Sequence, residues 1–325
     1  MKLPRRRFLH LVVGAALLPA LSRTVSAQVY PARPVRLIVP FGPAGATDIT
    51  ARLIGHWLSE RLGQQFIIEN RPGAGGNVGT EAVVRAPPDG YTLLYVTTAN
   101  ASNATLYDKL NFNFIHDIAP VAAIISFPYI MVVNPSVPAN TLPEFITYAK
   151  ANPGKINMAS PGIGSTPHVN GELFKVMTGT NMVHVPYRSA AAVMTDLLSG
   201  QVQLYFGTTA SSLEYVRAGK LRALGVTIER RLDALPEIPT VAEFVPGYEA
   251  SNWYGVGAPK ATPAEIIDKL NKEISAGLAD PNMKARLADL GGTVLAGSPA
   301  DFGKLIADET EKWAKVIKFA GVKAD

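Results

Sequence analysis

The sequence predicts an α/β protein of two lobes, each built on a mostly parallel sheet flanked by helices. The chain has 325 residues, 47% hydrophobic and 18% charged, enough for a sizeable core and, at about 150 residues per domain, for two domains. Past residue 28, short β-branched runs alternate with amphipathic stretches, which is typical of parallel sheets covered by helices. Helix starts are also well marked, since Thr141, Thr262 and Ser298 each stand three residues before a carboxylate.

The order of elements begins with a strand at Val35 to Val39, a helix from Ala46 to about Leu62 and a strand at Phe66 to Ile68. The last helix is expected from Pro299 to about Phe319, with an apolar stripe on one face. Further strands are predicted at Thr92 to Val96, Val121 to Ile125, Tyr129 to Val133, Ile156 to Ala159, Met182 to Pro186, Gln203 to Phe206 and Leu221 to Val226.

Two segments are candidates for crossings between the lobes, one near residues 126–128 and one from Tyr248 to Trp253. They divide the chain into a first lobe, residues 28–127 with 253–325, and a second lobe, residues 128–252. Neither lobe contains an internal repeat or a low-complexity tract.

The first 27 residues predict an export signal. Arg5, Arg6 and Arg7 precede an apolar run from Phe8 to about Leu21, and small residues at 25–27 suit cleavage near Ala27. A retained membrane anchor is the alternative, but the run falls short of the ~20 residues that span a bilayer. The arginines also resemble a twin-arginine signal, so the export route, general secretion or twin-arginine, stays open. The mature protein is expected in the periplasm.

Charge and cysteine content exclude several functions. Five of the 31 basic residues lie within the leader, and the remaining 26 balance 26 acidic residues, so the mature chain has no net field to attract nucleic acid. The absence of cysteine excludes disulfides, thiol nucleophiles and thiolate metal sites. The histidines show no metal-binding spacing. We therefore expect no metal, no cofactor and no nucleic-acid partner.

Three glycine-rich loops stand where a strand gives way to a helix, at residues 41–48, 71–77 and 160–166. In parallel sheets such loops meet at the carboxyl edge, where ligands bind. Missing side chains expose the backbone, and the free N–H groups of a first helical turn carry partial positive charge, so the expected ligand is an anion. A nucleotide is the rival, but Val78 replaces the third glycine of the dinucleotide motif, and no phosphate-binding lysine follows any loop.

Polar side chains near these loops are candidate contacts, each with a structural alternative. Thr47 and Ser165 are equally explained by helix capping. Asp48 either faces the positive end of a helix dipole or receives a ligand ammonium or hydroxyl. His168 donates to an anion or is a structural histidine, and Arg188 clamps a carboxylate or reaches solvent. The aromatic residues that either line a cleft or belong to the core are Tyr187, Trp253 and Tyr254.

Catalysis has no identifiable centre, so we expect a binding protein and not an enzyme. The alternative is a periplasmic serine hydrolase acting on small esters or amides, because Ser160 and Ser165 lie near His168. No Gly-x-Ser-x-Gly elbow surrounds either serine, and no third triad member is assignable. No catalytic residue is therefore assigned.

Several motifs together resemble one known family. They are Pro40-Phe41-Gly42-Pro43, Gly45-Ala46-Thr47-Asp48, Glu69-Asn70-Arg71-Pro72-Gly73-Ala74-Gly75-Gly76, Pro88-Asp89-Gly90-Tyr91-Thr92-Leu93, His184-Val185-Pro186-Tyr187, Gly219-Lys220-Leu221-Arg222 and Leu235-Pro236-Glu237-Ile238-Pro239-Thr240. The chain is similar, over essentially its whole mature length, to the Bug family of extracytoplasmic solute receptors of tripartite tricarboxylate transporters.

This resemblance implies a two-lobed periplasmic-binding-protein fold, the Venus flytrap, that closes on a small carboxylate and presents it to membrane subunits. A monomer without cofactors is expected. Two departures, Ala44 and Ser189, stand where the family commonly has glycine. The implied ligand-binding residues, most of the first-lobe ones acting through backbone N–H groups, are Phe41, Ala44, Gly45, Ala46, Thr47, Asp48, Ala74, Gly75, Gly76, Thr97, Asn100, Ser160, Gly164, Ser165, Thr166, His168, Tyr187 and Arg188.

Overall fold

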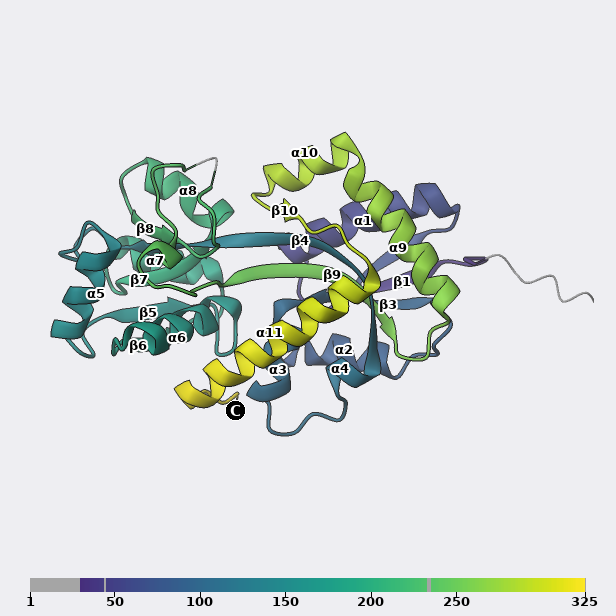
Figure 1. Cartoon of the computed structure of the whole chain (residues 1–325), viewed down its shortest axis with the longest axis horizontal. Helices are drawn as coiled ribbons and strands as arrows, with labels where there is room; N and C mark the ends of the chain where they lie inside the picture. Colours follow the sequence, from purple (N-terminus) through teal and green to yellow (C-terminus); the bar gives the residue numbers. More distant parts are fainter. Residues whose placement is uncertain (1–29, 44, 233–234, 325) are drawn as a thin grey trace, which may run out of the picture.

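The computed structural model describes residues 30–43, 45–232 and 235–324, so the predicted leader and Ala44 lie outside the described residues. Figure 1 shows an elongated molecule of two lobes joined by two long strands. The strands are β1 (Val35–Val39), β2 (Phe66–Asn70), β3 (Thr92–Thr97), β4 (Ile118–Val133), β5 (Asn157–Ser160), β6 (Val183–Pro186), β7 (Leu204–Thr208), β8 (Arg222–Val226), β9 (Ser251–Pro259) and β10 (Thr293–Val294).

Helices flank these strands on both lobes. None of them, within the described ranges, combines the length and hydropathy that a membrane crossing needs. They are α1 (Ala46–Leu62), the 3₁₀ turn η1 (Ala74–Gly76), α2 (Asn77–Val84), α3 (Thr98–Leu106), α4 (Phe114–Asp117), α5 (Leu142–Ala151), α6 (Thr166–Thr178), α7 (Ala190–Ser199), α8 (Thr209–Arg217), η2 (Val241–Glu243), α9 (Ala264–Ala279), α10 (Pro281–Asp289) and α11 (Pro299–Ala320).

The outer strands of both lobes are parallel, as the alternating pattern predicts. In the first lobe β1 lies between β2 and β3, and in the second lobe β5 lies between β6 and β7, with all four pairings parallel. Helices connect these strands, so each parallel set ends in loops at one edge. The sheets are mixed overall, because the central strands β4 and β9 pair antiparallel with each other and with their neighbours.

β4 and β9 connect the lobes, and here the sequence prediction was partly wrong. It placed a break at residues 126–128, but β4 continues from Ile118 to Val133 as one strand. Pairing with β9 persists through Phe127 and Pro128, and Phe127 is buried, so core packing outweighs the proline signal.

No strand was predicted at β9: only the crossing at Tyr248 to Trp253 overlaps its start, and its glycines weaken the strand pattern. Gly255 is required by close packing: a Cβ there would lie 2.2 Å from the Phe302 ring and 2.6 Å from the Ala122 carbonyl. Gly255, which weakens the strand pattern in the sequence, therefore allows Phe302 of α11 to pack against β9.

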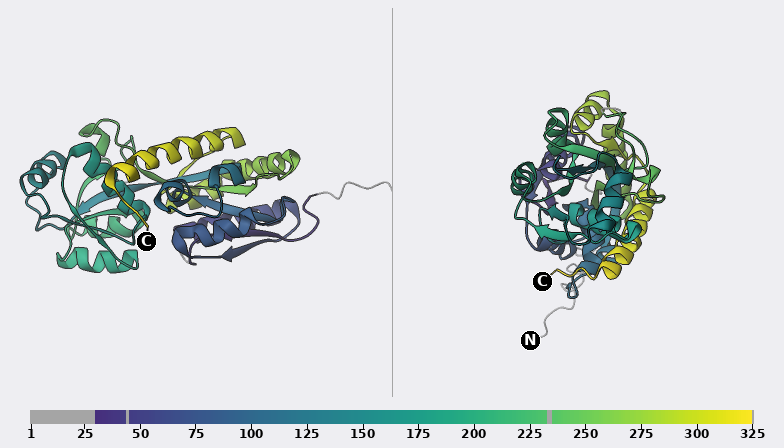
Figure 2. Two further views of the ribbon diagram at one scale, coloured as in Figure 1. Left: turned by 90° about the horizontal axis from the view of Figure 1, so that it is seen from below. Right: turned by 90° about the vertical axis from the view of Figure 1, so that its left-hand side faces the viewer.

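α11 spans both lobes along one side of the molecule (Figure 2) and packs against both α3 and α6. Its predicted cap is confirmed, because Ser298 and Asp301 form reciprocal hydrogen bonds at its start. The predicted cap at Thr262 is wrong: α9 begins after Pro263, and the buried Thr262 hydroxyl has no hydrogen-bond partner in the described part of the chain. The cap at Thr141 is confirmed.

Candidate ligand-binding cleft

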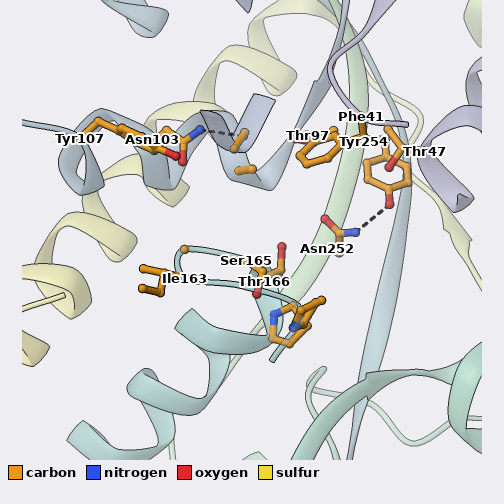
Figure 3. A pocket seen from close by; sticks show the side chains of 15 residues that line it. Phe41, Thr47, Thr97, Asn103, Tyr107, Ile163, Ser165, Thr166, Asn252 and Tyr254 are labelled. Carbon is orange, nitrogen blue, oxygen red and sulfur yellow. Dashed lines mark hydrogen bonds between the residues drawn. The ribbon is translucent and has the colours of Figure 1, made fainter. Parts of the chain in front are cut away.

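A cavity of about 350 Å³ lies where the two lobes meet (Figure 3). Its lining comes from the first lobe, from the connecting strand β9 and from the loop before α6 in the second lobe. None of the described lining residues carries a charged side chain. They are Phe41, Thr47, Gly75, Thr97, Ala99, Asn103, Tyr107, Pro161, Ile163, Gly164, Ser165, Thr166, Pro167, Asn252 and Tyr254.

The first turns of three helices line this cavity: Thr47 belongs to α1, Ala99 to α3 and Thr166 to α6. The first N–H groups of a helix have no partner within it and carry partial positive charge. The residues before α1 and α6, Gly45 and Ser165, provide no side-chain cap. Backbone donors of both lobes are therefore left for a ligand or for water.

The η1 turn brings backbone close to the cavity through a conformation that favours glycine. Gly75 has φ +62°, and a Cβ on it would meet the Tyr107 hydroxyl at 3.0 Å. Asn103 Nδ2 donates to the Gly75 carbonyl at 2.9 Å and so anchors the turn to α3. A side chain at residue 75 would be strained and would occupy cavity space.

On β9, Asn252 and Tyr254 lie on the same face because they are two residues apart in a strand. Asn252 Nδ2 donates to the Tyr254 hydroxyl at 2.8 Å. Burial raises the pKa of Tyr254, against the opposing effect of hydrogen bonds from Thr47 and Asn252. The phenol is therefore neutral near pH 7 and offers a proton as a donor.

The second-lobe wall is the loop from Pro161 to Pro167, whose shape is held by internal hydrogen bonds. Ser165 Oγ donates to the Gly162 carbonyl at 2.7 Å, which explains why this serine does not cap α6. The Gly164 N–H donates to Nδ1 of His168 at 3.0 Å. His168 is 3% exposed, so it is a structural histidine that shapes the loop from behind.

A second histidine stacks on this one. The rings of His168 and His184 lie 3.6 Å apart and nearly parallel, and Nε2 of His184 lies 2.7 Å from Ser160 Oγ. Burial, together with the charge of His168, lowers the pKa of His184 to about 4. Burial alone would raise the pKa of Glu172, but hydrogen bonds from His168 and Lys175 hold it below its usual range.

This geometry does not favour a hydrolase. Ser160 is fully buried, does not line the cavity and donates to the Gly162 carbonyl at 2.9 Å. Its histidine neighbour is His184, not His168, and among the described residues no carboxylate is hydrogen-bonded to that ring. A serine that reacts with an ester must be reachable from the cavity and needs an oriented base. The hydrolase alternative is not supported.

Seven of the predicted contact residues line the cavity: Phe41, Thr47, Gly75, Thr97, Gly164, Ser165 and Thr166. Others lie behind its wall. Asp48 is 3% exposed and pairs with Arg52 at 2.9 Å, and Asn100 holds the start of α3 by accepting from the Thr97 N–H. Predicted residues outside this lining are Gly45, Ala46, Asp48, Ala74, Gly76, Asn100, Ser160, His168, Tyr187 and Arg188.

On the second lobe, Tyr187 donates its hydroxyl to Asp196, and Arg188 is exposed. Of the aromatic alternatives, Trp253 belongs to the core and Tyr254 lines the cavity.

Several residues that line the cavity were not predicted from the sequence. Asn103 and Tyr107 are four residues apart along α3 and its end, a spacing that places them on one helix face. Asn252 required β9 to be predicted as a strand, because only the two-residue period puts it beside Tyr254. The missed lining residues are Ala99, Asn103, Tyr107, Pro161, Ile163, Pro167 and Asn252. Within the described ranges, no group of three or more His, Asp or Glu side chains is arranged to hold a metal ion.

Comparisons with known proteins agree with this architecture. Residues 50–322 match the family model described as "Tripartite tricarboxylate transporter family receptor", TctC. Protein BugT of Bordetella pertussis is 36% identical over 316 residues, which cover 96% of this chain and 97% of that protein.

Two solved structures resemble the fold over most of both chains. "R. palustris Rpa4515 with adipate" is 38% identical with a TM-score of 0.80, covering 90% of this chain and 99% of that one. The periplasmic binding protein BugD is 35% identical with a TM-score of 0.78, covering 91% and 100%. The family resemblance of the sequence motifs and the two-lobed periplasmic-binding-protein fold are thus confirmed. The chain belongs to the TctC, or Bug, family of tripartite tricarboxylate transporter receptors.

Proposed function

We propose that this protein is a periplasmic receptor that captures a small carboxylate and delivers it to the membrane subunits of a tripartite tricarboxylate transporter. One observation supports the proposal: first turns of helices from both lobes line one cavity, and none of its described lining residues carries a charged side chain. Oriented amides and hydroxyls stabilise a negative charge there without a cationic residue. Hydrogen bonds to a charged group contribute roughly 1.5 to 3 kcal/mol each, so a few suffice for useful affinity.

In this proposal the ligand carboxylate lies against the α1, η1 and α3 loops, and the Pro161 to Pro167 loop closes over it from the second lobe. The lobes are residues 28–127 with 253–325 and residues 128–252, and β4 and β9 act as the hinge. Closing the second-lobe loop removes the carboxylate from water and strengthens each hydrogen bond. The predicted contacts that lie outside the lining are proposed to act by shaping these loops.

The remaining parts of the proposal concern the exported form. We propose that the leader is removed near Ala27 and that the mature chain acts as a monomer. Mass spectrometry of protein purified from the periplasm tests the cleavage site, and light scattering tests the oligomeric state. A receptor of this kind performs no chemistry on its ligand, so the acid is expected to be recovered unchanged after release.

A thermal-shift screen of carboxylates on the mature protein tests the function. A ligand present at 100 times its dissociation constant adds ~2.7 kcal/mol of stability. The screen includes the amide analogue of each positive acid as a matched neutral control. The expected result is a shift with at least one small acid and none with its amide. No shift with any acid, together with turnover of an ester, would overturn the receptor proposal.

A further inference from the structure

The amide of Asn103 has used both of its N–H donors inside the protein. Nδ2 donates to the Gly75 carbonyl at 2.9 Å and to Asn77 Oδ1 at 3.0 Å. The carbonyl of Gly75 only accepts, so this interaction fixes which end of the amide is nitrogen. Asn103 is 2% exposed, lines the cavity, and accepts no hydrogen bond at Oδ1 from any described residue. Figure 3 shows its oxygen pointing across the cavity toward the second lobe.

A second amide presents the same end to the cavity. Asn252 is 9% exposed, and its Nδ2 donates to the Tyr254 hydroxyl at 2.8 Å. Its Oδ1 accepts no hydrogen bond within the described part of the chain, and Figure 3 shows it directed into the space between Thr97 and Ser165. The cavity is therefore faced by two amide oxygens, from nearly buried side chains, that have no donor among the described residues, alongside backbone N–H groups that need an acceptor.

A ligand with only carboxylate groups satisfies the N–H groups but places acceptor against acceptor at these two oxygens. A buried acceptor left without a donor costs about 1 to 3 kcal/mol. A ligand hydroxyl supplies the missing donor and has a lone pair for Tyr107, whose hydroxyl forms no hydrogen bond with the described residues and lies on the same side as Asn103. An ammonium group also donates, but none of the described lining residues has an acidic side chain to compensate its desolvated charge.

We infer that the ligand is a hydroxy acid, with its carboxylate on the backbone donors and its hydroxyl donating to the Asn103 or Asn252 side-chain oxygen. This inference rests on the proposed function and narrows it to one class of carboxylate. Asn103 and Asn252 are then the residues that determine specificity, whereas the helix first turns hold the charge common to all acids.

Calorimetric titration of matched acids tests the inference on the wild-type mature protein. Each set differs at one carbon only: succinate, malate and aspartate; butyrate, 3-hydroxybutyrate and 3-aminobutyrate. In the set that binds most tightly, the hydroxy acid is expected to bind at least about tenfold more tightly than the unsubstituted acid, which corresponds to ~1.4 kcal/mol. It is also expected to bind more tightly than the amino acid.

Equal or tighter binding of the unsubstituted acid overturns the inference and leaves the receptor proposal standing. Tighter binding of the amino acid also overturns it, because an unpaired ammonium would then be preferred. The receptor proposal itself is overturned by the result of the thermal-shift screen given above, in which no carboxylate shifts stability and an ester is turned over. The two failures are therefore distinguishable.

Variants assign the effect to residues. Asn103→Ala or Asn252→Ala, whichever removes the oxygen that accepts from the ligand hydroxyl, is expected to reduce the ratio between hydroxy acid and unsubstituted acid toward one. Asn271→Ala is the matched control, because Asn271 Nδ2 also bridges two carbonyls, those of Val121 and Gly297, away from the cavity. It is expected to keep the wild-type ratio. Because the readout is a ratio measured on folded protein, a loss of stability in a variant does not imitate the expected result. An unchanged ratio in both cavity variants contradicts the assignment.

Discussion

Replacing Gly75 with alanine separates backbone strain from ligand contact. The residue has φ +62°, and a Cβ would lie 3.0 Å from the Tyr107 hydroxyl and 3.3 Å from Asn103 Nδ2. A left-handed conformation costs a non-glycine residue roughly 1 to 2 kcal/mol, so the variant loses about that much stability. The η1 turn also shifts away from Tyr107 and Asn103, so at least one backbone donor leaves its place in the cavity.

Losing one hydrogen bond to a charged group costs roughly 1.5 to 3 kcal/mol, which predicts a loss of acid affinity of about 10- to 150-fold. Gly63→Ala is the matched control. Gly63 has φ +70° at the end of α1, and a Cβ there meets nothing within 4 Å. It is expected to lose similar stability but no affinity. Denaturant unfolding measures the stability and calorimetry measures the acid affinity. Wild-type affinity in Gly75→Ala, or equal affinity losses in both variants, would show that the backbone at residue 75 does not position a donor for the ligand.

Three further predictions concern particular side chains. Tyr254→Phe is expected to weaken acid binding about tenfold or more, because it removes a hydrogen-bond donor from the cavity. Tyr95→Phe is the control: it loses a buried hydroxyl bonded to Thr50 and is expected to lower only stability. Calorimetry measures the affinity and thermal unfolding measures the stability. The pKa of His184 is about 4 in the folded protein and 6.5 in the unfolded chain. The neutral ring therefore stabilises the fold fully above pH 6.5, and this stabilisation is lost as the pH falls toward 4. The expected loss of unfolding free energy is about 2 kcal/mol, because the ring is only partly buried and solvent screens its charge. In His184→Gln, the unfolding free energy should not show this pH-dependent loss. Glu309→Leu leaves two buried tryptophan N–H groups unpaired and is expected to cost about 2 to 4 kcal/mol in urea unfolding; a loss below ~1 kcal/mol contradicts this.

Elements with strong local signals were predicted well from the sequence. The helix predicted from Ala46 to Leu62 has those bounds, because a glycine C-cap follows an amphipathic run. The last helix was placed within one residue at its end, since its cap uses neighbouring residues only. Local chemistry determines such boundaries, and it is visible in the sequence.

Features set by distant contacts were not predictable in the same way. β4 crosses Pro128 without a break because β9 pairs with it, and Gly255 of β9 has no room for a side chain because Phe302 of α11 packs closely against it. Both features depend on contacts between segments that are not neighbours in the sequence. The predicted Thr262 cap is also absent: Thr262 is buried, and α9 begins after Pro263 without a side-chain cap.

The candidate site shows the same division. The glycine loops were recognised from composition and do line the cavity, through Thr47, Gly75 and Gly164. His168 was recognised as part of its loop, but only the structure shows that it accepts from the Gly164 N–H from behind the wall. Asn103 and Asn252 carry no sequence signal of their own, because their importance comes from which of their atoms are already paired.

A crystal structure of the mature protein with the tightest-binding acid shows whether main-chain N–H groups between the lobes bind the carboxylate. We expect the carboxylate in the cavity between the lobes, within hydrogen-bonding distance of main-chain N–H groups at the starts of α1, α3 or α6 or at the η1 turn, with no arginine or lysine contact. A carboxylate bound to Arg188, or an acid found elsewhere with this cavity containing only water, would contradict it.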